Sequence, residues 1–156
     1  MAAPNVMASS DPVVHADGRI GSLQIDVTTE AQLRAAVGVP YKIELERTPG
    51  YRGRYLYYRC GRGCATVYSI RDSTRALSDF STQSRRFVTE HGSRVGMTVA
   101  HAAALERGRI VPGCGYPRYI HVRWDAHHAF VLAIYHGKVD SIIYLGPHSI
   151  YYDGLC

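Results

Sequence analysis

The sequence predicts an α+β protein, a tandem repeat of a short helical segment plus antiparallel strands, with the helices on one face of an antiparallel sheet. Three observations lead to this prediction. A threonine opens each of two short helical patterns, at Thr28 and Thr98. A glycine closes each pattern, at Gly38 and Gly108, and a proline follows soon after. Strand-like segments rich in tyrosine and valine come next in both halves of the chain.

The repeat divides the 156-residue chain into three parts. Residues 1–17 are small and polar, and lack the charged and apolar regions of a signal peptide, so we expect a disordered lead-in or the remnant of a removed signal. Residues 18–90 form the first helix–sheet repeat and residues 91–156 form the second. We expect the two repeats to share a core as one compact unit, because a chain of this length suits a single small domain.

The first helix is predicted over residues 28–38. Thr28 is expected to cap its N-terminus, and Glu30 lies in the first turn, where the helix dipole favours a negative charge. Leu33 begins an apolar face at helical spacing. Gly38 suits the left-handed position that ends many helices.

The second helix is predicted over residues 98–108, with the same cap and the same stop. Both helices are too short to persist alone in water, so each must pack on a sheet. Alternating polarity and glycine turns predict strands at residues 41–47, 54–60, 64–70, 118–123, 129–135 and 138–145. Residues 85–89 predict a further strand or a link into the second half. Residues 72–84 are rich in Ser, Thr and Asp and predict a linker or an irregular loop.

The four cysteines are expected to form two disulfides. Four cysteines allow three pairings, and the division of the chain into halves selects Cys60–Cys64 and Cys114–Cys156. Two disulfides are typical of an oxidising compartment, so we expect a secreted or extracytoplasmic protein. The alternative is a zinc site on Cys60 and Cys64, but no second close pair of ligands follows at a fitting distance. The sequence therefore predicts no metal site and no cofactor.

Tyrosines are the strongest functional signal in the chain, which has 12 of them. Alternation along a strand turns one set of side chains toward solvent, and exposed Tyr, Trp and Arg are common at binding hot spots. We therefore predict that a protein partner binds the aromatic, open face of the sheet. The predicted binding residues are Tyr55, Tyr57, Tyr68, Tyr119, Trp124, Tyr135, Tyr144, Arg54 and Arg123. The alternative is that half of these rings belong to the core.

The charge of the chain favours acidic partners only weakly. The net charge is +5, but it is spread along the chain and is typical of a solvated surface. Arginine and tyrosine alternate near residues 51–62, a pattern that also suits single-stranded nucleic acid. An oxidised, extracellular chain is not expected to meet that ligand, so nucleic acid is not a predicted partner. No segment has the roughly 20 apolar residues of a spanning helix, so no membrane span is predicted.

The alternative function is a small extracellular hydrolase that uses His, Asp and Arg from the second repeat. The histidines His121, His127, His128 and His136 lie near Asp125 and Asp140. His121 or His128 with Arg123 would supply general acid–base chemistry. The spacing matches no catalytic motif, and histidines in turns are commonly just exposed. The sequence therefore predicts no catalytic residue and a protein that is not an enzyme.

Two short motifs carry a resemblance to known families. Gly96-Met97-Thr98-Val99 and Val37-Gly38-Val39-Pro40 resemble the start and the end of the repeated unit in small outer-membrane assembly lipoproteins. Over residues 18–156, the order of helices, strands and disulfides also resembles the β-lactamase inhibitory proteins and is similar to secreted actinobacterial proteins of that kind. The first copy departs from the motif, because Asp26-Val27 replaces Gly-Met. The resemblance implies an inhibitor-like module whose partner is an enzyme or a cell-envelope protein, although a shared fold does not establish function.

Overall fold

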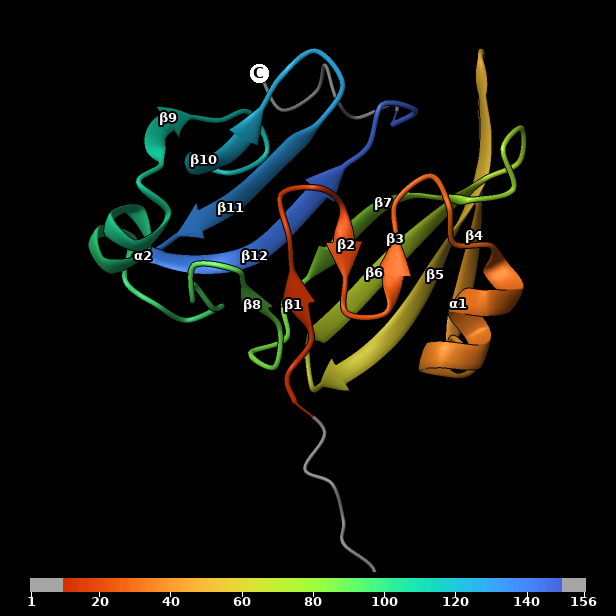
Figure 1. Ribbon diagram of the computed structural model, residues 1–156, viewed down its shortest axis with the longest axis horizontal. Helices are drawn as coiled ribbons and strands as arrows, with labels where there is room; N and C mark the ends of the chain where they lie inside the picture. The colour runs from red at the N-terminus through yellow and green to blue at the C-terminus, as the bar shows by residue number, and fades with distance from the viewer. Residues whose placement is uncertain (1–9, 150–156) are drawn as a thin grey trace, which may run out of the picture.

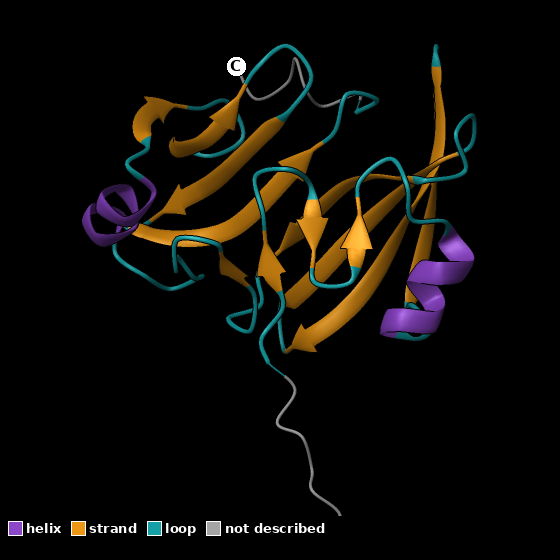
Figure 2. Ribbon diagram, in the orientation of Figure 1, coloured by secondary structure: helices purple, strands orange, loops and turns teal. Residues whose placement is uncertain are grey.

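The chain folds into two β-sheets and two short helices in the computed structural model, which describes residues 10–149 (Figure 1). The strands are β1 (Val13–Val14), β2 (Arg19–Ile20), β3 (Leu23–Gln24), β4 (Lys42–Thr48), β5 (Tyr51–Gly61), β6 (Cys64–Arg71), β7 (Leu77–Thr82), β8 (Val88–Thr89), β9 (Arg109–Pro112), β10 (Arg118–Trp124), β11 (Ala129–Tyr135) and β12 (Lys138–Leu145). The helices are α1 (Glu30–Val37) and α2 (Val99–Glu106). Strands hold far more of the described chain than the two helices do, as Figure 2 shows.

A large antiparallel sheet of eight strands is the frame of the molecule. Its order is β4-β5-β6-β7-β12-β11-β10-β9. The central pair is β7 and β12, where Phe80 lies opposite Tyr144 and Ser81 lies opposite Ile143. A small sheet of order β3-β2-β1-β8 lies across one face of the large sheet (Figure 1). We call that covered face the inner face, and the opposite one the outer face.

The hydrophobic core lies between the two sheets. The small sheet contributes Val14 and Ile20, and the large sheet contributes Phe80, Leu132 and Tyr144, all of them buried in one cluster. Each such side chain contributes roughly 1.5–3 kcal/mol when it is removed from water. Because strand residues alternate between faces, the neighbours of these core residues point to the outer face.

The predicted α+β fold, with helices covering one face of the sheet, is wrong, because the protein is mostly β. Each helix has eight residues and buries few of them. The buried residue of α1 is Leu33, and those of α2 are Ala102 and Glu106. The small sheet, and not the helices, covers the middle of the inner face. A tandem helix-plus-strand repeat does not describe this architecture. The strands of the small sheet are two residues long, so they carry no alternation that a sequence pattern reveals.

The linker predicted at residues 72–84 is also wrong, because it contains β7, a central strand of the large sheet. Its polar residues are buried but hydrogen-bonded to neighbouring strands. The hydroxyl of Thr82 lies 2.7 Å from the hydroxyl of Thr66, and the hydroxyl of Ser78 donates to the carbonyl of Ser69 at 3.2 Å. Because neighbouring strands satisfy its polar groups, β7 can be a central strand although its composition is typical of a loop.

Part of the predicted lead-in, residues 10–17, belongs to the small sheet, and residues 1–9 lie outside the described part of the chain. Residues 10–17 carry β1, which pairs antiparallel with β2 and parallel with β8. Val14 is fully buried in the core. The strand expected at residues 85–89 is reduced to the two residues of β8. These short strands form the small sheet because their apolar side chains lie against the inner face of the large one.

Strands β4, β5, β6, β10, β11 and β12 match their predictions within a few residues, whereas β9 was not predicted. In β4, Glu44 lies opposite Tyr55 while Ile43 lies opposite Leu56, so acidic and apolar side chains separate onto two faces as expected. The hairpin of β11 and β12 turns at His136 and Gly137, whose φ angles are 49° and 74°. Two consecutive positive φ angles are typical of the tight turn that joins antiparallel strands.

The helix caps are close to those predicted. Thr29 rather than Thr28 caps α1, and its side chain and that of Gln32 form a capping box. Thr28 is buried, and its hydroxyl accepts the backbone N–H of Gln24 at 2.8 Å. Thr98 caps α2 as predicted, with its side chain accepting a backbone N–H from the first turn.

The glycines that end the two helices are required for different reasons. Gly38 has a φ of 93°, but its ψ of −160° places it outside the left-handed helical conformation that the sequence predicted. At the end of α2, Arg107 takes the left-handed conformation with a φ of 50°. Gly108 is needed for space, since an added Cβ would lie 2.5 Å from Cγ2 of Ile120 and 2.6 Å from the carbonyl oxygen of His121.

Each reason predicts a cost for substitution by alanine. Gly108→Ala is expected to lower the free energy of unfolding by about 2 kcal/mol, because backbone packed on β10 must move. Gly38→Ala is expected to cost about 1–3 kcal/mol, because essentially only glycine adopts the backbone conformation at this position. Urea denaturation of both variants measures the two losses. A loss well below about 1 kcal/mol for Gly108→Ala would contradict the close approach of α2 to β10.

Candidate functional site

The outer face of the large sheet carries an open groove of about 770 Å³, which we call the outer groove. Its lining residues are Glu44, Leu45, Glu46, Tyr55, Tyr57, Val67, Ser69, Asp79, Phe80, Ser81, Gly115, Tyr116, Tyr119, Ile143 and Leu145. They come from six strands, β4, β5, β6, β7, β10 and β12, and from the loop between β9 and β10. The groove therefore crosses the sheet instead of following one strand.

Strand alternation builds the groove from the same segments that build the core. Along β5, Leu56 is fully buried in the core, so Tyr55 and Tyr57 on either side of it point to the outer face. The register places Tyr57 opposite Val67 of β6 and Tyr55 opposite Ser69. Side chains from three adjacent strands, β4, β5 and β6, thus form one wall.

A hydrogen-bonded aromatic cluster forms the β4–β5 end of the groove. The hydroxyl of Tyr57 donates to Oε2 of Glu44 at 2.5 Å, and the ammonium of Lys42 pairs with the same carboxylate. Lys42 also lies 5.1 Å from the centroid of the Tyr57 ring. The Lys42 hydrogen bond, followed by that of Tyr57, holds the pKa of Glu44 below its usual value. The carboxylate therefore stays ionised under most conditions.

A second pair of tyrosines forms the opposite end. Tyr116 and Tyr119 meet edge to face with their centroids 5.9 Å apart. The hydroxyl of Tyr116 donates to Oδ2 of Asp140 at 2.9 Å. An added Cβ at Gly113 would lie 2.0 Å from the Tyr119 ring, so a glycine there lets the loop pack directly on this ring. Burial raises the pKa of both tyrosines.

Asp79 of β7 contributes a buried carboxyl to the groove floor. The residue is 4% exposed. The hydroxyl of Ser78 lies 3.3 Å from its Oδ2, while its buried Oδ1 accepts no hydrogen bond within residues 10–149. Burial, which outweighs the hydrogen bonds of Ser149, Gly146 and Ser78, raises the pKa of Asp79 to about 7. A buried carboxyl with one unsatisfied oxygen and a shifted pKa is typical of functional sites.

The groove is acidic although the protein as a whole is basic. Its lining includes the carboxyls of Glu44, Glu46 and Asp79, and no lysine or arginine from the described part of the chain. The whole chain carries 18 basic and 13 acidic side chains. The described lining of the groove therefore combines carboxyls with tyrosines.

The structure brings together three of the aromatic residues predicted for binding. Tyr55, Tyr57 and Tyr119 line the outer groove, where Tyr119 is itself 2% exposed and packs in a second buried cluster with Val131 and Ala133. Tyr68 and Tyr144 belong to the core between the sheets, where they are 2% and 0% exposed. The five rings thus divide between the two faces of the large sheet.

The four other predicted residues lie away from the groove. Trp124 stacks on His121 with ring centroids 4.4 Å apart, and Tyr135 is exposed beside the β11–β12 turn. Arg54 forms ion pairs with two acidic side chains. Arg123 pairs with an aspartate and donates to a backbone carbonyl. Both arginines therefore link segments of the chain.

Sequence reasoning missed Asp79, Tyr116 and Glu44. Asp79 and Tyr116 fall in segments that we expected to be a linker and a connection. Glu44 had a usable signal, because it shares a face of the β4–β5 ladder with Tyr55 and Tyr57. Cross-strand neighbours of this kind can be read from sequence once the register of a hairpin is known.

The histidines of the alternative hydrolase do not line the outer groove. His128 lies 3.3 Å from Asp125, but the pair sits on the turn between β10 and β11. Asp125 accepts the backbone N–H groups of His127 and His128 at 2.8 and 2.9 Å, which makes it a turn cap. Its pKa is lowered chiefly by the backbone hydrogen bond of His127.

The predicted disulfide Cys60–Cys64 is confirmed, with the two Cα atoms 5.1 Å apart. Cys114 is disulfide-bonded as well, but the predicted pair Cys114–Cys156 includes Cys156, which lies outside the described residues. Within residues 10–149, no group of three or more His, Cys, Asp or Glu side chains is arranged to hold a metal ion. Neither helix of that region is long and apolar enough to cross a membrane.

Comparison with known proteins shows a similarity of fold. No family model and no curated protein matches the chain. The uncharacterized protein yfeY from Escherichia coli is similar over 85% of this chain and 98% of its own, with a TM-score of 0.58 and 13% identity. An extracellular protein containing a SCP domain, from Bacillus anthracis str. Ames, is similar over 76% of this chain, with a TM-score of 0.51 and 10% identity.

The chain spans 43% of the length of that extracellular protein. At these low identities the likeness concerns the fold alone, which is mostly β. The resemblance to β-lactamase inhibitory proteins and assembly lipoproteins rests on short motifs, and no family model matches it. Function must therefore be argued from the outer groove itself.

Proposed function

We propose that this protein is a secreted, non-enzymatic module that holds a protein partner in the outer groove. The observation that carries the proposal is that tyrosines and carboxyls line the same groove. Tyrosines from β5, β10 and the β9–β10 loop line a groove whose described lining carries three carboxyls, one of which, Glu44, is paired with Lys42 at the groove's end. Aromatic side chains at the centre of a concave surface are typical anchors of protein–protein interfaces.

The chemistry of the groove favours a basic loop of the partner. A lysine or arginine would be attracted by the carboxyls of Glu46 and Asp79, and by the faces of the tyrosine rings. Apolar residues beside it would pack on Val67 and Ile143. The net charge of +5 repels basic proteins from the rest of the surface, so this distribution of charge would direct such a partner to the groove.

Two observations support a secreted or extracytoplasmic location. The Cys60–Cys64 disulfide is of a kind that persists in oxidising compartments. One structural neighbour is described as an extracellular protein. In such a setting the partner would be an enzyme or an envelope protein, and the module would be inhibitor-like where the bound basic loop borders an active site.

A capture experiment with matched variants tests the proposal. The immobilised protein is exposed to culture supernatant and envelope extract, and captured proteins are identified by mass spectrometry. The groove variant combines Tyr55→Ala, Tyr57→Ala and Glu44→Gln. The control combines Trp124→Ala and Tyr135→Ala, which remove exposed rings outside the groove.

We expect the groove variant to lose its specific partner and the control variant to keep it. Truncation of an interface tyrosine commonly costs about 2 kcal/mol, so the combined groove variant should bind at least about 100-fold more weakly. Titration calorimetry with the purified partner measures this change. Undiminished binding by the groove variant, or equal loss in both variants, would show that the partner binds elsewhere.

A further inference from the structure

A second concave surface lies on the inner side of the large sheet. It measures about 1450 Å³ and is bounded by β1–β3, the end of α1 and the tip of the β5–β6 hairpin. Tyr58 and Thr66 line it, whereas their neighbours Tyr57 and Val67 line the outer groove. Because strand residues alternate, the two surfaces open on opposite faces of the sheet.

Four exposed arginines line this second surface, which we call the arginine cleft. They are Arg59, Arg62, Arg85 and Arg86. None of the four forms an ion pair within residues 10–149, although Arg19, Arg34, Arg54, Arg94 and Arg123 all do. The acidic residue among the described lining, Asp11, is paired with Arg94 at 2.8 Å. The cleft therefore presents four uncompensated positive charges.

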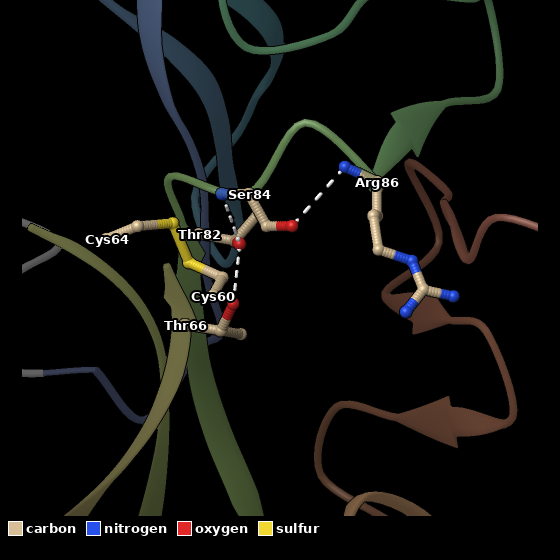
Figure 3. The surroundings of a disulfide bond; sticks show 6 residues. All are labelled: Cys60, Cys64, Thr66, Thr82, Ser84 and Arg86. Atoms are coloured by element: carbon tan, nitrogen blue, oxygen red, sulfur yellow. Dashed lines mark hydrogen bonds between the residues drawn. A yellow bond between two sulfur atoms is a disulfide. The ribbon is translucent and has the colours of Figure 1, made fainter. Parts of the chain in front are cut away.

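Local structure constrains the backbone at Arg59, Arg62 and Arg86 before any ligand arrives. The disulfide closes the hairpin tip, with Arg59 directly before Cys60 and Arg62 between the two cysteines. Figure 3 shows the hydrogen bonds beside it: the N–H of Ser84 donates to the hydroxyl of Thr82 at 3.0 Å, and the N–H of Arg86 donates to the hydroxyl of Ser84 at 3.3 Å. Charges presented on a constrained backbone lose less entropy on binding.

The floor of the cleft is apolar and offers few free ring faces. Val39 is 81% exposed, and Leu23 and Phe87 also line the surface. The ring of Tyr41 is already covered by the guanidinium of Arg59, 4.6 Å from its centroid. The hydroxyl of Tyr58 donates to the carbonyl of Gly38 at 3.1 Å. Such a floor suits aliphatic side chains better than stacked bases.

We infer that the arginine cleft binds an acidic protein segment in which carboxylate and apolar side chains alternate. Guanidinium groups pair with carboxylates through two parallel hydrogen bonds. The apolar side chains between the carboxylates cover Val39 and its neighbours. A phosphate polymer would satisfy the arginines but leave this floor exposed to water, and a flat membrane surface does not enter a cleft. The inference is independent of the outer groove.

Fluorescence anisotropy tests this inference with a labelled peptide in which glutamate alternates with leucine. The cleft variant combines Arg59→Gln, Arg62→Gln, Arg85→Gln and Arg86→Gln. The control combines Arg47→Gln, Arg52→Gln, Arg109→Gln and Arg118→Gln, which removes the same charge from exposed arginines outside the cleft. Thermal melts verify that both variants are folded.

We expect the cleft variant to bind the peptide at least about tenfold more weakly than the native protein does, because several charged hydrogen bonds are lost. The control variant should differ by less than about threefold, the effect of net charge alone. Cys60→Ser with Cys64→Ser should weaken binding several-fold while the fold persists, since Arg62 loses its constrained loop.

Three outcomes would overturn the inference. Equal weakening in the cleft and control variants would reduce the binding to general charge. Tighter binding of inorganic polyphosphate than of the peptide, lost in the cleft variant, would assign the cleft to phosphate polymers. Binding to phosphatidylglycerol vesicles in place of the peptide, lost in the same variant, would assign it to anionic lipid. None of these results would affect the proposal for the outer groove.

Discussion

Asp79→Asn is expected to raise the free energy of unfolding at pH 8 by about 2–4 kcal/mol. The residue is 4% exposed, and burial raises its pKa to about 7 from the ordinary value of 3.8. Between those two pH values the folded protein holds the proton more tightly than the unfolded chain does. The stabilisation due to the protonated carboxyl is therefore complete below about pH 4 and is lost as the pH rises through about 7.

Urea denaturation at several pH values measures this effect. The native protein should lose stability between pH 4 and 7 by up to about 1.4 kcal/mol per pH unit, and the variant should lose much less. Asp72→Asn is the control, because Asp72 is an exposed aspartate in the loop before β7, where a substitution should change stability by about 0.5 kcal/mol or less. An unchanged pH profile in Asp79→Asn would show that another group controls it.

The same variant should bind the partner more weakly even though it is more stable. An ionised Asp79 adds negative charge to the floor of the outer groove, and asparagine does not. Binding of a basic loop by the native protein should therefore tighten as the pH rises through about 7, and this dependence should vanish in the variant. A residue that lowers fold stability at neutral pH is common at functional sites.

Glu106→Ala is expected to lower the free energy of unfolding by about 3 kcal/mol. Glu106 ends α2, and its side chain is fully buried. The hydroxyl of Thr89 donates to its Oε1, and Nδ1 of His91 lies 2.9 Å from its Oε2. Alanine would leave a cavity and a buried hydroxyl without its acceptor, two of the larger causes of destabilisation. Glu106 therefore ties α2 to the turn that follows β8.

A conservative substitution separates this role from the loss of volume. Glu106→Gln keeps the size and an acceptor oxygen, so it should lose no more than about half as much stability as Glu106→Ala. A double-mutant cycle with Thr89→Ala should give a coupling energy above about 1 kcal/mol. Additive effects in that cycle would mean that the Thr89–Glu106 hydrogen bond does not stabilise the fold.

The parts of the fold that the sequence predicted are those with local signals. The β11–β12 hairpin was predictable because apolar strands flank His136-Gly137, and both helices were predictable from their threonine caps. β7 was not, because its hydroxyls and carboxyl are satisfied by strands that lie far away in the sequence. The small sheet was missed for another reason, since a strand of two residues has no period. The predicted fold class was wrong because the helices have clear sequence signals, whereas β7 and the small sheet do not.

The candidate site was predictable only in part, because strand alternation shows which residues share a face but not which of the two faces is buried. The pattern separates Tyr57 from Leu56, but it does not say which face of the strand is covered. On β6 the tyrosine points inward and Val67 lines the groove, so Tyr68 was placed on the wrong side by its residue type alone. The small sheet covers one face of the large sheet, and the residues on that face become the core.

The pairing of β7 with β12 has a consequence for the order in which the protein can fold. These central strands are far apart in the chain, so the large sheet stays in two pieces until residues 138–145 arrive. Until then β7 is an exposed edge, and the closure of so long a loop makes this the slow step. An edge strand resists pairing with other chains when it carries a charge on its face. At mildly acidic pH, Asp79 is neutral in the folded sheet but ionised in the unpaired strand. Its charge therefore opposes pairing of β7 with other chains before β12 is in place.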